Sequence, residues 1–404
     1  MSCFICSNTN LRLIIDLGKH PPPLNFLTNT QIQNRKERSF PLKLFYCEKC
    51  RLCQLGNAVN PELMFKEYTY TSGISVDFRN HLNSLVKTLM KKFQLGSNDF
   101  VIDIGSNDGT LLSYFRSHGV KVLGVEPSNI AKLALANRIS TINEFFDVQV
   151  SKKILQNEGT AKIITATNVF AHVNKLDSFM KGVKMLLDTF GIFVSESQYL
   201  LDIIEKLEYD TIYHEHLRYY ALKPLMTLFE QYDMEIFDVE RIPSHGGSIR
   251  VYAGHKDIFS KSNSIKKLIK EEESKELYSL STLKLFAKRI KENKDVLMSL
   301  LFDLKRQGKK IVGISAPARS STILNYCGIN SKILDYIVEK GQLKIGRYTP
   351  GTHIKVVDDK ILIQEQPDYA LLLSWHLKDS IVTKIRNDGY DGKIIVPLPQ
   401  VEII

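Results

Sequence analysis

Short apolar runs alternate with helix-patterned segments through most of the chain, and this alternation is the main guide to its fold. In the central part, four apolar runs have the length and composition of buried strands, at residues 101–104, 122–125, 163–166 and 192–194. Helical patterns separate these runs, which is typical of βαβ units and predicts a doubly wound parallel sheet. The same alternation restarts nearer the C-terminus and predicts a second α/β sheet with strands at 310–314, 334–338, 369–373 and 394–396.

Two other stretches follow different patterns. The first block, to about residue 62, is rich in proline and asparagine and has no long helical period. The segment 260–307 is strongly charged, and its apolar residues recur near a period of 3.6, which predicts connecting helices that end at Gly308. We therefore expect an α/β protein of three domains, at 1–62, 63–255 and 256–404, the last including the helical linker.

Composition narrows the class of protein. The 404 residues are 44% hydrophobic and carry 54 Lys and Arg against 44 Asp and Glu, as expected for a globular protein with a modest basic excess. The sequence has neither a long apolar run nor a secretory signal, so we expect a cytoplasmic protein with no membrane partner. Because basic and acidic residues interleave along 261–310, we also expect no nucleic-acid partner.

Cysteines cluster at the N-terminus, where five of the six lie within the first 53 residues. Two Cys-x-x-Cys pairs, Cys3 with Cys6 and Cys47 with Cys50, have the spacing of a four-sulfur zinc site of structural type. Reduced cysteines without a metal and an iron–sulfur cluster are the alternatives. Cys53 is surplus to this set, and we expect it to pack as a small hydrophobic residue.

A glycine-containing turn follows the first central strand. Gly105 and Gly109 let the backbone pass close to a ligand at the start of a helix, and the spacing is not that of a dinucleotide-binding G-x-G-x-x-G turn. The Asp-x-Gly-x-x-x-Gly string that begins at Asp103 instead resembles the first motif of S-adenosylmethionine-dependent methyltransferases. Glu126 ends the second strand, where a carboxylate can accept both hydroxyls of a ribose.

A dense polar cluster, Tyr-His-Glu-His, occupies residues 213–216. Such a group can supply a general base, an orienting partner and a hydrogen-bond donor. Two alternatives remain open from the residues alone. On a strand, His214 and His216 would share a face and could bind a metal, and the cluster could also be a polar patch at an interface.

The combination of motifs resembles the S-adenosylmethionine-dependent C-methyltransferases that act on nucleotide-linked deoxysugars. The resemblance covers nearly the whole chain and implies an N-terminal zinc domain, a central methyltransferase domain and a C-terminal Rossmann-like domain. Its marks are the four cysteines and the strings at 68–73, 103–109, 213–216, 244–248, 313–319, 325–328 and 346–353. Departures at 197–199, 313–319 and 339–342 weaken any transfer of substrate identity.

The resemblance also implies roles for individual residues. His216 would be the general base, with Tyr213 and Glu215 beside it. Tyr70 matches an active-site tyrosine, with Tyr68 as the alternative in a neighbouring register, and His172 matches a histidine near the cofactor sulfonium. The cofactor, S-adenosylmethionine, would be bound by Asp103, Gly105, Asn107, Gly109, Glu126 and Asn168, and the substrate diphosphate by Arg319, Lys344, Arg347 and His353.

The expected reaction is transfer of a methyl group to a carbon beside the ketone of a nucleotide-linked keto-deoxysugar through an enolate, with dTDP as the expected nucleotide. A zinc ion would have a structural role, and we expect a monomer or a weak homo-oligomer. Two competing hypotheses are an O- or N-methyltransferase acting on a sugar or secondary metabolite, and an RNA methyltransferase with a zinc ribbon.

Overall fold

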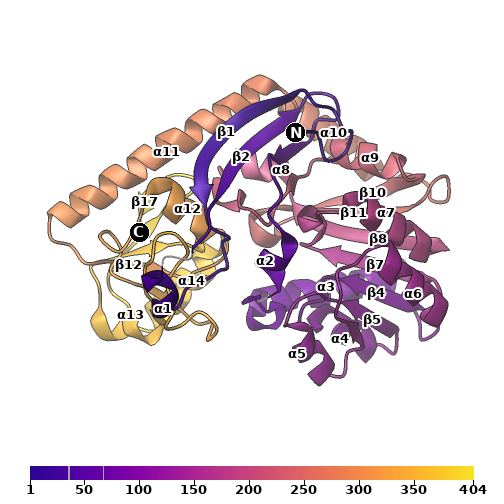
Figure 1. The fold of residues 1–404 in the computed structure, drawn as a ribbon, viewed down its shortest axis with the longest axis horizontal. Helices are drawn as coiled ribbons and strands as arrows, with labels where there is room; N and C mark the ends of the chain where they lie inside the picture. Colours follow the sequence, from indigo (N-terminus) through magenta and orange to yellow (C-terminus); the bar gives the residue numbers. More distant parts are fainter. Residues whose placement is uncertain (35–36, 67) are drawn as a thin grey trace.

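The computed structural model describes residues 1–34, 37–66 and 68–404, and its strands form three β-sheets (Figure 1). A four-stranded sheet near the N-terminus has the order β1-β2-β3-β9, and a seven-stranded sheet has the order β10-β11-β8-β7-β4-β5-β6. A six-stranded sheet near the C-terminus has the order β14-β13-β12-β15-β16-β17. The architecture is α/β, as the sequence predicts.

The seven-stranded sheet contains the four strands that the central apolar runs predict. Its strands are β4 (Phe100–Ile104), β5 (Lys121–Val125), β6 (Thr141–Ile142), β7 (Ala161–Thr167), β8 (Leu187–Gln198), β10 (Met234–Ile242) and β11 (Ser248–His255). Strands β4 to β8 pair in parallel, whereas β10 and β11 form an antiparallel hairpin that joins the sheet through β8. The four predicted strands are parallel, and the hairpin adds two antiparallel strands that were not predicted.

The six-stranded sheet repeats the strand order of the parallel part of the central sheet. Its strands are β12 (Ile311–Ile314), β13 (Ile337–Glu339), β14 (Val356–Asp358), β15 (Tyr369–Leu372), β16 (Lys393–Val396) and β17 (Glu402–Ile403). In both sheets the order of the strands reverses beside the first strand. The reversal lies between β4 and β7 in the central sheet and between β12 and β15 in the C-terminal sheet. Ligands of open α/β sheets bind at such a reversal, outside the carboxyl ends of the strands.

The N-terminal sheet is a long hairpin with two short strands added. Its strands are β1 (Leu11–His20), β2 (Phe40–Cys47), β3 (Cys53–Leu55) and β9 (Arg218–Tyr219). The hairpin lies alongside the long helix α11 (Leu280–Arg306) and contacts α12 (Ser320–Cys327) (Figure 1). Because β9 belongs to the segment that directly follows the Tyr-His-Glu-His cluster, its pairing with β3 fixes that segment to the N-terminal sheet.

Helices connect and cover the sheets, and the charged segment forms α10 and α11, as its 3.6 period predicts. Helix α10 spans Asn263–Ser274. The remaining α-helices are α1 (Asn29–Gln33), α2 (Pro61–Phe65), α3 (Val76–Lys92), α4 (Thr110–Ser117), α5 (Ala131–Ala136), α6 (Val148–Glu158), α7 (Leu176–Leu186), α8 (Leu200–Glu205), α9 (Leu222–Glu230), α13 (Lys360–Glu365) and α14 (Lys378–Asn387). Helix α11 ends shortly before Gly308, which has a φ of 71°. In the described ranges, no helix is long and apolar enough to cross a membrane.

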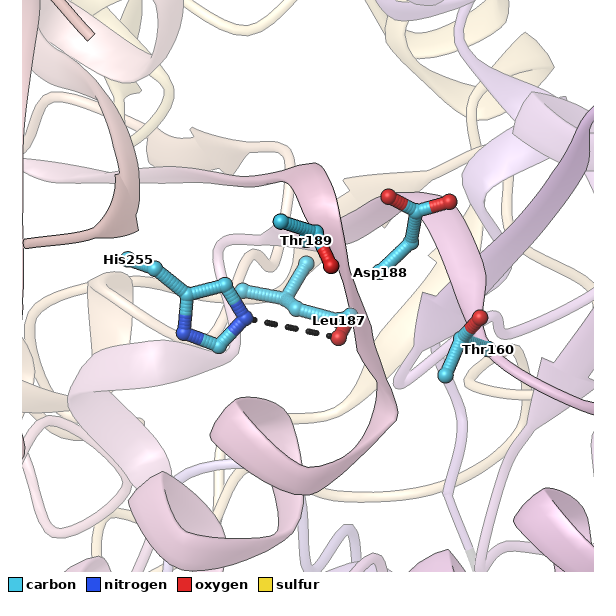
Figure 2. Close-up of a pocket in the computed structure, with 5 residues that line it drawn as sticks. All are labelled: Thr160, Leu187, Asp188, Thr189 and His255. Atoms are coloured by element: carbon cyan, nitrogen blue, oxygen red, sulfur yellow. Dashed lines mark hydrogen bonds between the residues drawn. The ribbon is translucent and has the colours of Figure 1, made fainter. Parts of the chain in front are cut away.

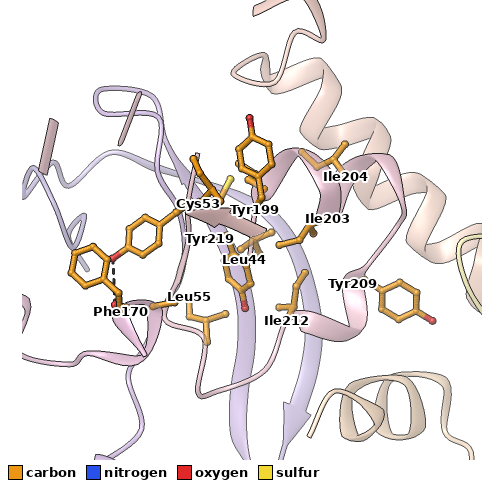
Figure 3. Close-up of a cluster of buried hydrophobic side chains, with 14 of the residues drawn as sticks. Leu44, Cys53, Leu55, Phe170, Tyr199, Ile203, Ile204, Tyr209, Ile212 and Tyr219 are labelled. Atoms are coloured by element: carbon orange, nitrogen blue, oxygen red, sulfur yellow. Dashed lines mark hydrogen bonds between the residues drawn. The ribbon is translucent and has the colours of Figure 1, made fainter. Parts of the chain in front are cut away.

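Buried side chains join the N-terminal sheet to the segment that carries the Tyr-His-Glu-His cluster. Figure 3 shows Leu44, Cys53 and Leu55 of the N-terminal sheet packed with Ile212 and Tyr219 of that segment. All five are at most 2% exposed. Burial of such side chains contributes roughly 1.5–3 kcal/mol each for the large apolar ones, so the cluster is held on a rigid support.

Candidate active site at the carboxyl edges of two sheets

A cavity of about 1380 Å³ lies where the carboxyl edges of the two larger sheets face each other. The turns after β4 and β7 line it from the central sheet, and the turns after β12 and β15 line it from the C-terminal sheet. Leu24 and residues 60–62 and 65, from the N-terminal part of the chain, line the same cavity. The cavity is large enough for two ligands side by side, since single drug-sized ligands occupy about 300–1,000 Å³.

The turn after β4 has the close-approach geometry that its glycines predict. Gly105 has a φ of 71°, and a Cβ atom there would lie 2.3 Å from Cγ2 of Val169. Gly109 also has a positive φ, of 79°, at the N-cap of α4. Asp103, at the end of β4, is buried and accepts a hydrogen bond from the Thr165 hydroxyl at 2.6 Å. Burial raises the pKa of Asp103 to about 7.

Glu126 follows β5 and holds the cofactor turn in place. Its Oε2 accepts the backbone N–H of Asn107 at 2.9 Å, and its Oε1 accepts the backbone N–H of Ser128 at 2.8 Å. Each carboxylate oxygen has further lone pairs, so the group can accept ribose hydroxyls as well. The Asn107 side chain bonds the backbone of Ser72 and Tyr70, so it ties the segment at 70–72 to the turn.

Asn168 and His172 follow β7 and have unpartnered polar atoms that are buried. Neither the amide nitrogen nor the amide oxygen of Asn168 has a hydrogen-bond partner among the residues that the structure describes, and the same holds for Nε2 of His172. Both residues line the cavity. A buried polar group without a partner costs about 1–3 kcal/mol, so these atoms fit a site that a ligand completes. Burial lowers the pKa of His172 to about 4.

The Tyr-His-Glu-His cluster lies in an irregular turn between η3 (Tyr209–Thr211) and β9, and three of its four residues line the cavity. These are Tyr213, Glu215 and His216. His214 is not among the lining residues, and its Nε2 lies 3.2 Å from the backbone carbonyl of Phe40. The structure therefore separates the two histidines and does not place them together as on one face of a strand.

The hydrogen bonds of His216 define the state of its ring. Nδ1 lies 2.7 Å from the backbone carbonyl oxygen of Thr211. A carbonyl only accepts, so Nδ1 carries the hydrogen and Nε2 of the neutral ring keeps its lone pair. Burial holds the pKa of His216 well below its ordinary value, and the nearby His172 ring, 5.0 Å away between centroids, lowers it further. His216 is thus a neutral imidazole with a free ring nitrogen at neutral pH.

The acidic and phenolic neighbours of His216 keep their protons at neutral pH. Burial raises the pKa of Glu215 to about 8, and burial also raises the pKa of Tyr213 well above its ordinary value. The Tyr213 ring lies against His216, with 4.0 Å between centroids. The hydroxyl of Tyr68 lies 3.3 Å from Oε2 of Glu215, whereas the Tyr70 ring packs against Tyr68 at 6.4 Å. Tyr68 is therefore the tyrosine in contact with the cluster.

The four predicted diphosphate-binding residues divide into two pairs. Arg319 and Lys344 line the cavity, whereas Arg347 and His353 are absent from its lining. Arg319 pairs with Asp210, and Lys344 donates to the Ala316 carbonyl at 2.9 Å and lies 3.4 Å from Glu339. His353 lies 2.9 Å from Glu37. A role for any of the four in binding diphosphate stays a prediction.

The zinc motif folds into one compact cluster. Sulfur atoms of Cys3 and Cys50 lie 3.3 Å apart, those of Cys6 and Cys47 lie 3.5 Å apart, and all four lie within 4.8 Å of one another. A tetrahedral zinc ion with Zn–S bonds of about 2.3 Å separates its sulfurs by roughly 3.8 Å, so the donor set fits the ion. Cys53 is outside this set and is buried in the core.

Metal binding by the Tyr-His-Glu-His cluster finds no support in the structure. Of the described residues, only the four cysteines form a group of three or more ligand side chains close enough to hold one metal ion. The open alternative of a histidine metal site is therefore wrong for this part of the chain, whereas the general-base interpretation keeps a suitable geometry.

One cavity-lining group escaped the sequence analysis. Nε2 of His81, on α3, lies 2.7 Å from Oε2 of Glu196, which is fully buried and also accepts from Nε of Arg250 at 2.6 Å. The available signal was Glu196 itself, a charged residue that follows the apolar run at 192–194 of β8 (Leu187–Gln198). Buried carboxylates are rare unless they are paired, so this position predicts a basic partner without naming it.

Comparison with known proteins gives three adjoining family matches. Residues 3–65 match a zinc binding domain, residues 78–239 match a methyltransferase domain, and residues 243–399 match a C-methyltransferase C-terminal domain. The chain is also similar along its whole length to the C-methyltransferase NovU of Streptomyces niveus. The two share 29% identity over 405 residues, which cover 100% of this chain and 96% of NovU.

Solved structures resemble about half of the chain. The PH0226 protein from Pyrococcus horikoshii OT3 has 16% identity and a TM-score of 0.37, and covers 46% of this chain and 95% of its own. Magnesium protoporphyrin IX methyltransferase from Synechocystis PCC 6803 has 13% identity and a TM-score of 0.35, and covers 45% of this chain and 84% of its own. The three matched domains and the full-length similarity to NovU identify the chain as an S-adenosylmethionine-dependent C-methyltransferase similar to NovU, with an N-terminal zinc-binding domain.

Proposed function

We propose that this methyltransferase transfers a methyl group to a carbon beside the ketone of a nucleotide-linked keto-deoxysugar. The observation that carries the proposal is the state of His216, whose Nδ1 donates to the Thr211 carbonyl and leaves Nε2 as a free base. His216 lines the same cavity as Asp103 and Glu126, the residues expected to bind the methyl donor. A base beside a methyl donor suits an acceptor atom that must first lose a proton.

Carbon methylation requires a carbon nucleophile, and a sugar carbon becomes one when a neighbouring ketone stabilises its anion. In this proposal Nε2 of His216 takes the proton, the electron pair of the C–H bond forms the enolate double bond, and the ketone oxygen gains the charge. The enolate carbon would then bond to the methyl group while the methyl–sulfur bond of S-adenosylmethionine breaks and leaves its electron pair on sulfur, so that S-adenosylhomocysteine departs and the ketone is restored. The lowered pKa of His216 keeps the ring neutral and ready to accept the proton at neutral pH.

The enolate oxygen needs hydrogen-bond donors. Tyr213 and Glu215 line the cavity beside His216, and their raised pKa values keep both protonated at neutral pH. Tyr68 touches Glu215 and extends the same group of donors. A preorganised donor at such a position contributes about 3–4 kcal/mol to stabilisation of the developing charge.

S-adenosylmethionine supplies an electrophilic methyl group when it is bound. The residues that would hold it are Asp103 for the ammonium group, Glu126 for the ribose hydroxyls and Asn168, whose amide has no partner among the residues described. Gly105 and Gly109 have positive φ, and a Cβ on Gly105 would meet Val169, so the tight turn at the end of β4 requires glycine. These features support a cofactor site at this turn.

The nucleotide part of the substrate is proposed to lie on the C-terminal wall of the cavity. That wall is the strand-reversal point of the six-stranded sheet and carries the lysines at 340, 344 and 384. Cationic side chains and the backbone N–H groups after β12 suit a diphosphate. A dTDP-linked sugar remains the expected substrate, in line with the resemblance that the sequence motifs carry.

The test is solvent exchange at the carbon to be methylated. The protein is incubated in heavy water with candidate nucleotide-linked 4-keto sugars, with and without S-adenosylmethionine. We expect one deuterium beside the ketone without the cofactor and a product one methyl group heavier with it. His216→Asn should abolish both reactions while cofactor affinity stays within about twofold of the wild-type value.

A matched control is available in the same turn. His214→Asn removes an imidazole that contacts the Phe40 carbonyl and does not line the cavity, so exchange and methylation should continue. A product labelled on oxygen or nitrogen would contradict the proposal and favour an O- or N-methyltransferase. Exchange that survives His216→Asn would contradict the choice of base.

A further inference from the structure

Arg319, at the N-cap of α12, is the centre of a buried ion cluster that crosses between two sheets. Its Nε lies 2.7 Å from Oδ2 of Asp210 and its Nη2 lies 2.7 Å from Oδ1 of the same carboxylate, which is a bidentate pair. Nη2 also lies 3.2 Å from Oε2 of Glu208. The Arg319 side chain is 8% exposed and both carboxylates are fully buried.

Further contacts lock this cluster to the C-terminal domain and to the active-site turn. The indole Nε1 of Trp375 donates to Oδ2 of Asp210 at 2.8 Å, and the guanidinium lies 5.2 Å from the Trp375 ring. The hydroxyl of Thr322, on α12, donates to the backbone carbonyl of Ile212 at 2.7 Å. The segment at 208–216 is therefore held by α12 and η5 (Trp375–Leu377).

Asp210, which anchors the segment to Arg319, is only one peptide unit away from the carbonyl that orients the His216 ring. Asp210 precedes Thr211, and the Thr211 carbonyl accepts the hydrogen of Nδ1 of His216. A shift of Asp210 would move that carbonyl and rotate the imidazole. A displacement of about 1 Å at a catalytic group can cost on the order of 100-fold in rate, so the anchor is placed where its effect is largest.

The charges of the cluster oppose a role for Arg319 in binding phosphate. One guanidinium faces the two carboxyl groups of Asp210 and Glu208, which accept from its Nε and Nη2, and its Nη1 donates to the His245 carbonyl at 3.3 Å. Burial raises the pKa of Glu208 to about 7, so part of its charge is lost at neutral pH, but no positive excess remains. The carboxylates that already accept from Nε and Nη2 would repel a diphosphate that approached the guanidinium.

We infer that Arg319 is a positioning residue, whose ion pair with Asp210 aligns the His216 imidazole with a substrate carried by the C-terminal domain. The inference rests on the proposed function, because it concerns proton removal by His216. In this inference the interface between the two large domains both forms the cavity and orients the base. The C-terminal domain then contributes to the reaction through the orientation of the base, not only through binding.

Steady-state kinetics separate this role from phosphate binding. Loss of a side chain that binds substrate and transition state equally raises KM and leaves kcat unchanged, whereas misalignment of the base lowers kcat. The variants are Arg319→Lys, which keeps the charge and loses the bidentate geometry, and Asp210→Asn, which keeps the shape and loses the charge. Arg386→Lys is the matched control, because Arg386, in the last turn of α14, donates to the carbonyls of Tyr390 and Gly392, which follow that helix.

The experiment uses the full-length, zinc-loaded protein with the keto-sugar substrate identified by the exchange test. Arg319→Lys and Asp210→Asn should each lower kcat and the rate of deuterium exchange by about 100-fold, with KM for the sugar within about threefold. The double variant should lose little more than either single one, because the two residues act as a unit. Arg386→Lys should match the wild type.

Other outcomes overturn the inference. A rise in KM with kcat unchanged assigns Arg319 to the diphosphate, and wild-type behaviour of both variants removes any positioning role. If the ion-pair variants do not fold, Trp375→Phe keeps the ring and removes the donor to Asp210. It should lower kcat about 10-fold with KM unchanged, and an unchanged kcat overturns the inference. Absence of exchange in the wild type contradicts the proposed function itself, before any variant is measured.

Discussion

Nδ1 of His216 lies 2.7 Å from the backbone carbonyl of Thr211, and this contact fixes which ring nitrogen can act. A side-chain partner for Nδ1 could change its protonation, whereas a backbone carbonyl cannot. The ring is therefore held in a single tautomer with Nε2 free. Because burial also lowers the pKa of this ring well below its ordinary value, the base is available over a wide range of pH.

The first prediction concerns the acidic side of the pH profile. Proton removal needs neutral His216, and the neutral form predominates above its pKa. Since that pKa lies well below 6.5, the exchange rate should stay constant as pH falls from 7.5 to 6.5 and should decline only at lower pH. Deuterium exchange without the cofactor measures this step alone. A decline centred near 6.5 would indicate a solvent-exposed histidine as the base.

The second prediction concerns the alkaline side and Glu215. Its pKa of about 8 means that the carboxyl group is protonated below that pH and charged above it. If the proton is donated to the enolate oxygen, kcat should fall as pH rises through about 8. Glu215→Gln keeps a donor at all pH values and should abolish this alkaline decline. If the alkaline decline of kcat is unchanged in Glu215→Gln, the decline belongs to another group.

Hydrophobic patterning predicted most of the fold because buried parallel strands are continuous apolar runs. All eight predicted strands form, six of them within two positions of the predicted ends, whereas β8 extends from Leu187 to Gln198, beyond the predicted 192–194. The strand expected at 334–338 starts late, at Ile337, although the backbone N–H of Asp335 already donates to the Ile311 carbonyl at 3.0 Å. The antiparallel β10–β11 hairpin was not predicted, because charged residues such as Glu240 and Arg250 interrupt the continuous apolar runs that marked the other strands.

The site was predicted less completely, because chemistry that depends on distant partners leaves little local trace. Turn glycines and cysteine pairs are short-range patterns, and the structure brings each set together. The carboxylate partners of Arg319, by contrast, lie more than 100 positions earlier in the chain, so a lone arginine after a strand resembled a phosphate ligand. His81 was missed for the same reason, because its partner Glu196 is distant in the sequence and only the fold brings the two side chains together.

The third prediction tests the cofactor site. Glu126→Gln replaces one acceptor oxygen by a donor, which cannot accept from the backbone N–H groups of Asn107 and Ser128 or from a ribose hydroxyl. Hydrogen bonds to charged groups contribute about 1.5–3 kcal/mol, so the Kd for S-adenosylmethionine should rise roughly 10- to 100-fold. Isothermal titration calorimetry measures it. Glu158→Gln, at the exposed end of α6, is the control and should bind normally.

The fourth prediction concerns the zinc site. The protein should contain one zinc ion per chain, and Cys47→Ser should lose it, because three sulfurs bind zinc less tightly than four. Loss of the metal should lower the melting temperature by on the order of 10 °C, since the ion closes the hairpin that supports the active-site turn. Metal analysis and calorimetry measure both effects. Cys53→Ala removes a buried thiol outside the cluster and should keep the full zinc content.

The fifth prediction separates two tyrosines that the sequence could not distinguish. Tyr68 and Tyr70 lie two positions apart, but only the Tyr68 hydroxyl contacts Glu215, at 3.3 Å. The backbone carbonyl of Tyr70 instead accepts from the Asn107 amide, a contact that phenylalanine preserves. Tyr68→Phe should therefore lower kcat by about 10-fold or more, because it removes one donor from the group around the enolate oxygen.

Tyr70→Phe is the matched variant for this comparison, since it removes the same hydroxyl from the same segment. Its kcat should stay within about threefold of the wild type, and both variants should bind S-adenosylmethionine normally, because neither change alters the cofactor turn. Methyl transfer to the keto sugar under saturating cofactor measures kcat. The reverse order of effects would mean that the Tyr70 hydroxyl turns toward the substrate when the cavity is filled, and that the contact between Tyr68 and Glu215 belongs to the ligand-free protein alone.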